Sequence, residues 1–79
     1  MKIQNTTQLG ATIRATRKQL KVTQKELAMV SGTGLRFVID LEKGKPTCQI
    51  GKTLDVLAAL GLHVDLLDTS TAPLQARPS

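Results

Sequence analysis

The sequence predicts a mostly α-helical domain of four helices, followed by one short strand. Apolar side chains recur at helical spacing from residue 9 to residue 60, and capping residues divide this stretch into four segments. Residues 62–66 then alternate with a period of two, which is typical of a strand. The stretch 22–47 reads as two short helices joined by a glycine-containing turn, the layout of a helix-turn-helix DNA reader.

The basic composition narrows the class of partner. Eleven Lys and Arg against six Asp and Glu in 79 residues give a formal net charge of +5, which favours a polyanion such as DNA, RNA or an anionic membrane surface. The single aromatic residue, Phe37, provides no stacking platform for single strands, so duplex DNA is favoured. No apolar run suits a membrane helix or a secretory signal, so we expect a cytoplasmic protein with no membrane partner.

The first helix is indicated by Leu9, Ile13 and Leu20, which we expect in the core. Thr6 or Thr7 is expected to cap its N-terminus. The rest of its surface is expected to carry Arg14, Arg17 and Lys18.

The second helix begins with a capping box. The Thr23 hydroxyl can accept from the Glu26 backbone N–H, and the Glu26 carboxylate can accept from the Thr23 N–H. Gly32 is expected to end the helix in a left-handed conformation. The residues expected to be buried are Leu27, Ala28 and Val30.

The third helix is expected from about Leu35 to Lys43, with Val38 and Leu41 in the core and Gly44 at its end. A fourth helix, capped by Thr47 and closed by Gly61, is expected to bury the stripe Ile50, Leu54, Leu57 and Leu60. The helical glycines Gly10 and Gly51 are expected where helices pack closely.

The predicted strand, residues 62–67, has no partner strand elsewhere in the chain. Antiparallel pairing with a second copy, through Leu62, Val64 and Leu66, would satisfy its backbone and form a homodimer. The alternatives are that this segment extends the fourth helix or forms an ordered loop. We therefore divide the chain into a DNA-binding domain, residues 1–68, and a disordered tail, residues 69–79, rich in Ser, Thr, Pro and Ala.

Residues that often serve catalysis or metal binding have no suitable neighbours in the sequence. His63 is the only histidine and lies in no Cys, Asp or Glu cluster of ligand spacing. Cys48 is the only cysteine, and we interpret it as a structural thiol. We therefore expect no catalytic residues, no metal site, no cofactor and no enzymatic activity.

Five runs of the sequence together carry a resemblance to a known family. They are Thr23-Gln24-Lys25-Glu26-Leu27-Ala28, Gly32-Thr33-Gly34, Arg36-Phe37-Val38, Leu41-Glu42-Lys43-Gly44-Lys45-Pro46-Thr47 and Leu57-Ala58-Ala59-Leu60-Gly61-Leu62. With these runs, residues 7–68 resemble the Xre/Cro family of helix-turn-helix regulators, and in particular its HipB-type antitoxin branch. That branch has a lambda-repressor-like fold that ends in a short dimer-forming strand.

The resemblance implies that the third helix enters the major groove with Leu35, Arg36, Ile39 and Asp40 nearest the bases. The guanidinium fork of Arg36 matches the O6 and N7 acceptors of guanine. Asp40 either accepts from cytosine, orients Arg36, or forms a solvated ion pair with it. The family often has a polar residue at position 35, so Leu35 and Ile39 either contact a thymine methyl or read nothing.

The resemblance also assigns residues to the DNA backbone and to the core. The expected phosphate contacts are Thr23, Gln24, Lys25, Lys43 and Lys45, although any single lysine could equally be a solvated charge. Glu42 matches a glutamate that pairs with a basic residue of the first helix, here Arg14 or Arg17. Phe37 is expected in the core rather than against the DNA backbone.

The function implied is that of a homodimeric repressor at an inverted-repeat operator, associated with the bacterial nucleoid when bound. The HipB-like branch further implies an antitoxin that neutralises a HipA-like serine/threonine kinase toxin encoded beside it. The alternatives are a stand-alone or phage-type repressor without a toxin, and a helix-turn-helix protein-interaction module that does not read DNA.

Overall fold

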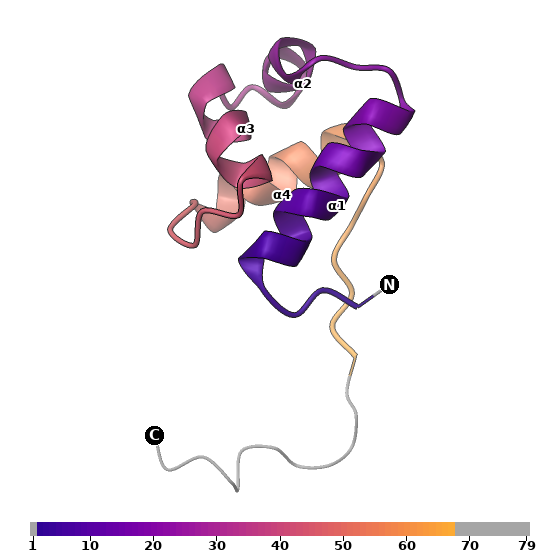
Figure 1. Cartoon of the computed structure of the whole chain (residues 1–79), viewed down its shortest axis with the longest axis vertical. Coiled ribbons are helices and arrows are strands. Elements are labelled where there is room, and N and C mark those ends of the chain that lie inside the picture. The colour runs from indigo at the N-terminus through magenta and orange to yellow at the C-terminus, as the bar shows by residue number, and fades with distance from the viewer. Residues whose placement is uncertain (1, 68–79) are drawn as a thin grey trace, which may run out of the picture.

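The computed structural model describes residues 2–67, which form four helices and, within that range, no strand (Figure 1). The helices are α1 (Thr6–Gln19), α2 (Gln24–Ser31), α3 (Leu35–Glu42) and α4 (Ile50–Ala59). The predicted mostly α-helical, four-helix class is confirmed, and none of the described helices is long and apolar enough to cross a membrane. The tail predicted for residues 69–79 lies outside the described range.

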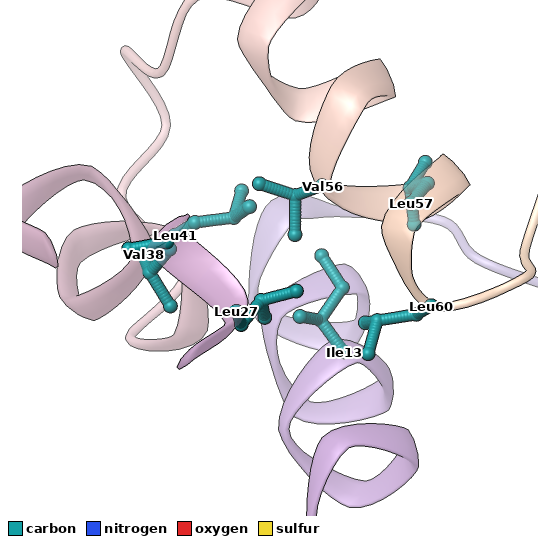
Figure 2. Packing of buried hydrophobic residues seen from close by; sticks show 8 residues of the cluster. Ile13, Leu27, Val38, Leu41, Val56, Leu57 and Leu60 are labelled. Atoms are coloured by element: carbon teal, nitrogen blue, oxygen red, sulfur yellow. The ribbon is translucent and has the colours of Figure 1, made fainter. Parts of the chain in front are cut away.

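Each helix contributes one fully buried side chain to a single core (Figure 2): Ile13, Leu27, Val38 and Val56. Burying a side chain of this size stabilises a fold by roughly 1.5–3 kcal/mol, so these four side chains account for much of the attraction between the helices. The sequence correctly predicted three of them, Val56 being the exception. The remaining core residues are Ala28, Leu41, Leu57 and Leu60, all of them predicted.

The buried face of α4 differs from the predicted stripe. Ile50 and Leu54 are exposed, with Ile50 at 72%, whereas Thr53 and Val56 point into the core. Together with Leu57, these inward positions follow the i, i+3, i+4 spacing of one helix face. The Thr53 hydroxyl can be buried because it donates to the Gln49 carbonyl at 2.9 Å. A buried threonine thus takes a place that the apolar pattern assigned to its neighbours.

Two further predictions of burial were wrong. Leu20 is the C-cap residue of α1 and is about half exposed, since the chain leaves the helix there. Val30 lies on the outer side of α2 and is largely exposed. Leu9 is half-buried and packs against the core, as predicted.

The N-caps of α1 and α4 lie outside the residues that the sequence suggested. Asn5, rather than Thr6 or Thr7, caps α1, because its side chain accepts a backbone N–H of the first turn at 2.8 Å. Gln49, rather than Thr47, precedes α4, and it makes no side-chain capping bond. Both threonine predictions therefore placed the start of the helix within two residues of its position but named the wrong residue as the N-cap.

The capping box of α2 is confirmed. The Glu26 N–H donates to the Thr23 hydroxyl at 3.0 Å, and the Thr23 N–H donates to the Glu26 carboxylate at 2.8 Å. The Thr23 N–H is the main reason why the pKa of Glu26 is lowered from its ordinary value. Gly32, at φ 71°, ends α2 in the predicted left-handed conformation, and Gly44, at φ 85°, follows α3.

Gly10 allows α1 to pack directly on the end of α3. A β-carbon at this position would collide with the Leu41 carbonyl oxygen and lie 2.8 Å from that of Glu42. Close packing is therefore confirmed for Gly10. It was wrong for Gly51, where a β-carbon would meet nothing within 4 Å in the described chain.

Residues 62–67 follow α4 without helical or strand structure. The Leu62 N–H donates to the Leu57 carbonyl at 2.8 Å, and its side chain packs against the core, so the start of this segment is anchored. Val64, Leu66 and Leu67 beyond it are exposed. The alternative that the segment extends α4 is excluded, and the predicted strand pairing with a second copy stays a prediction.

The two helical glycines give opposite expectations for stability. Gly10→Ala should destabilise the fold by about 1–3 kcal/mol, because the new methyl group overpacks against the α3 backbone. Gly51→Ala should stabilise it by about 0.5–1 kcal/mol, because alanine favours the helix and meets no neighbour. Urea unfolding of both variants beside the parent measures the difference, and equal effects of the two substitutions would contradict the packing assigned to Gly10.

Candidate nucleic-acid interface

The outer side of α3 presents the four predicted base-contacting residues on one helix. Leu35 and Arg36 are exposed at its N-terminal end, and Ile39 and Asp40 are half-buried one turn later. The opposite side of the helix is fixed in the core by Val38 and its neighbours. Gly34, at φ 91°, precedes the helix and makes no side-chain capping bond, so the backbone at this end is uncovered. The arrangement suits insertion of the N-terminal end of α3 into a groove.

Arg36 and Asp40 form an ion pair across one turn of α3, with 3.5 Å between Arg36 Nε and Asp40 Oδ1. Lys45, in the loop after α3, lies with its Nζ 3.6 Å from the other oxygen, Asp40 Oδ2. The Asp40 side chain is 20% exposed and that of Arg36 81% exposed, so the carboxylate is the more buried partner of the pair. The Arg36–Asp40 pair was one of the alternatives that the sequence left open for Asp40, whereas the link to Lys45 was not predicted.

The N-terminal end of α2 lies beside the end of α3. Gln24 was predicted to bind a phosphate through its side-chain amide and its backbone N–H. The side-chain amide donates to Glu42 Oε1 at 3.1 Å, so this group already has a partner within the protein. The backbone N–H of Gln24, at the first position of α2, belongs to the uncovered amide groups of a helix N-terminus, where an anion is favoured. The Thr23 hydroxyl oxygen accepts the capping bond, which leaves its own O–H free to donate to another acceptor. Lys25 and Lys43 are exposed.

A buried ion pair joins α1 to α3 behind this surface. Arg17 Nε lies 2.6 Å from Glu42 Oε2 and Arg17 Nη2 lies 3.1 Å from Glu42 Oε1, with the two side chains 9% and 3% exposed. The third arm of the guanidinium, Nη1, donates to the Val22 carbonyl at 2.8 Å. The sequence placed Arg17 on the surface of α1, which is wrong. The family resemblance allowed Arg14 or Arg17 as the partner of Glu42, and the structure identifies Arg17.

Phe37, on α3, and Cys48, in the loop between α3 and α4, both pack against the core. Phe37 is half-buried and packs against the core as predicted, while the Lys52 ammonium lies 5.8 Å from the centroid of its ring. Cys48 is half-buried and unpaired, and it also packs against the core. No group of three potential metal ligands occurs within residues 2–67.

A second, apolar surface lies away from α3. Residues 62–67 line a groove together with the N-terminal segment and parts of α1 and α4; its apolar lining is Ile3, Leu9, Leu57, Leu62, Val64, Leu66 and Leu67. The exposed Ile50 and Leu54 lie on α4 at helical spacing from Leu57. This apolar surface contains the three residues that the sequence predicted for dimerisation: Leu62, Val64 and Leu66.

Comparisons with known proteins agree on the class of this chain. No protein-family model matches it. It is 52% identical over 66 residues to the uncharacterized HTH-type transcriptional regulator y4mF of Sinorhizobium fredii (strain NBRC 101917 / NGR234), covering 84% of this chain and 87% of that protein.

Two solved structures share its fold. Both are complexes of HipB, one of a HipB variant with the O2 20mer and one of HipB with the O4 20mer. Each superposes with a TM-score of 0.80 at 27% identity and covers 89% of this chain, corresponding to 97% and 99% of the HipB chains.

The buried position of Arg17 predicts a large effect of its loss. Arg17→Met should lower the free energy of unfolding by about 3–5 kcal/mol, because the Glu42 carboxylate would remain buried without its counter-charge. Arg14→Met, one turn earlier on the exposed side of α1, should change it by less than about 0.5 kcal/mol. Chemical denaturation of the two variants compares the same substitution at a buried and at an exposed arginine. Similar decreases in the free energy of unfolding would argue against the buried pair.

Proposed function

The chain belongs to the HTH-type transcriptional regulators and is of the Xre-like, HipB type, and on that premise we propose that it is a homodimeric repressor of an inverted-repeat operator in duplex DNA. The observation that carries this proposal is the outer side of α3, where an exposed Arg36 stands at the uncovered end of the helix. A net charge of +5 supports a polyanionic partner. The HipB 20mer complexes, of the same fold, support the choice of DNA.

In this proposal the phosphates supply affinity and α3 supplies specificity. Lys25 and Lys43, with Thr23 and Gln24 at the start of α2, neutralise or hydrogen-bond phosphates and release counterions. Lys45 lies beside the same surface, but its ammonium is paired with Asp40. Arg36 reads guanine through its two amino groups. Leu35 and Ile39 face the same groove and are suited to thymine methyl groups.

If Arg36 reads a base and Lys43 contacts a phosphate, their loss should have different effects on base preference and on the salt dependence of binding. Arg36→Ala should cost roughly 1–3 kcal/mol on the operator and relax base preference at one position per half-site. Lys43→Ala should weaken binding to every sequence and reduce the salt slope by about one. Titrations of both variants at several salt concentrations test this, and an equal loss on all sequences for Arg36→Ala would refute base reading.

In this proposal, two copies of the chain form a dimer by contact between their apolar surfaces around residues 62–67. Val64, Leu66 and Leu67 are exposed there, the backbone of the segment has no strand partner within residues 2–67, and Ile50 and Leu54 add apolar area beside it. Two such segments paired about a two-fold axis would cover one another. A two-fold dimer would place two α3 helices about one turn of DNA apart, which corresponds to an inverted repeat.

Val64→Asp should convert the dimer to monomer, because it places a charge in the centre of the apolar surface. Sedimentation velocity measures the mass, and operator binding should fall with dimerisation. Val30→Asp is the matched control, since it makes the same change on an exposed valine of α2. A Val64→Asp protein that sediments like the parent would refute this surface as the interface.

The finer proposal is an antitoxin that binds a HipA-like serine/threonine kinase toxin. It is supported by the likeness to HipB at 27% identity over nearly the whole HipB chain. The adjacent gene should encode a kinase-like protein that co-purifies with this chain from the native operon. A neighbour of another kind, together with intact operator binding, would favour a stand-alone repressor. Failure to retard the upstream DNA with and without a partner would favour a protein-interaction module.

A further inference from the structure

Asp40 stands between two of the cations assigned to DNA binding. Its oxygens lie 3.5 Å from Arg36 Nε and 3.6 Å from Lys45 Nζ, so each carboxylate oxygen has its own cation. The side chain is only 20% exposed, whereas those of Arg36 and Lys45 are 81% and 52% exposed. Asp40 is therefore an anion placed beneath the surface that would face a polyanion.

The contact with Arg36 is made through Nε, and this determines what the guanidinium can still do. Nε lies on the edge of the guanidinium next to the aliphatic stem, so pairing there leaves both Nη groups available at the far end. Those two groups form the fork that matches guanine O6 and N7. Pairing with Asp40 one turn away also restricts the rotamers of a side chain that is otherwise in solvent.

The contact with Lys45 is reinforced by the backbone. The Lys45 N–H donates to the Asp40 carbonyl at 3.1 Å, so the loop after α3 is attached to the same residue at two points. Lys43, two residues earlier, is exposed and is the C-cap residue of α3. Lys43 and Lys45 were both predicted from the sequence to contact phosphates, but only Lys45 lies beside a carboxylate among the described residues.

We infer that Asp40 is a specificity-determining residue that positions Arg36 for base reading and at the same time withholds the charge of Lys45 from the DNA backbone. This inference rests on the proposed function. Asp40 lowers affinity for any DNA, because a carboxylate repels phosphates that bind within the Debye length of about 8 Å. It preserves discrimination, because Arg36 meets the bases already oriented.

The test compares Asp40→Asn with the parent on two duplexes of equal length, the upstream segment that the parent protects in footprinting and a scrambled version. We expect affinity for the scrambled duplex to rise about fivefold and the salt slope to steepen by about one, because Lys45 becomes free to neutralise a phosphate. The ratio of the two affinities should fall about tenfold, through the loss of an oriented guanine contact.

Two further variants identify the route of each effect. Adding Lys45→Ala to Asp40→Asn should return the salt slope to that of the parent. Adding Arg36→Ala to Asp40→Asn should reduce discrimination no further than Arg36→Ala alone, because both act through one side chain. Asp55→Asn is the control, because it makes the same change of charge on the exposed side of α4. It should change neither the salt slope nor the ratio of the two affinities, and it should raise the affinity for both duplexes only slightly.

Several outcomes would overturn the inference. An unchanged salt slope and affinity ratio in Asp40→Asn would show that the carboxylate controls neither cation. A loss confined to one cytosine, with the guanine preference intact, would make Asp40 a base contact instead. If the parent itself bound both duplexes equally, the proposed function would fail and the inference with it. Thermal unfolding of each variant separates these results from a loss of folded protein.

Discussion

The buried ion pair between Arg17 and Glu42 is the interaction on which the geometry of this domain depends. It joins α1 to the end of α3, and through Gln24 and the Val22 carbonyl it also holds the beginning of α2. A buried pair recovers its desolvation cost only when the remaining donors and acceptors are satisfied. That condition is met, since no buried side-chain nitrogen or oxygen within residues 2–67 lacks a partner. The pair therefore fixes relative positions more than it adds net stability.

The position of the pair in α3 leaves the other end of the helix for recognition. Glu42 is the last residue of α3, and Gly10 lets the α1 backbone approach the same end. The helix is thus held at its C-terminus and along Val38, while Arg36 at its N-terminus remains in solvent. A reader held by a rigid support loses little conformational entropy on binding, which favours specific association.

The sequence located the four helices because the apolar period, the α2 capping box and the glycines after α2 and α3 are local signals, and it failed where the cause is distant or polar. The capping box at Thr23 involves residues three apart, so it can be predicted from the local sequence. Arg17 was placed on the surface because its partner lies 25 residues away, and only the family resemblance suggested a pair. On α4, periodicity could not separate a buried Thr53 from an exposed Ile50, because exposed apolar residues are common on folded proteins.

The exposed apolar residues of α4 bear on how the protein assembles. Ile50 and Leu54 have the apolar character of core residues and follow the spacing of the buried Leu57, yet the described chain leaves them uncovered. Of the residues on α4, Leu57 lines the apolar groove beside residues 62–67. A domain of this size buries only a limited share of its surface, so a second copy on this side would extend the core. Because α3 carries the other surface, assembly and base reading would then use separate elements of one rigid unit.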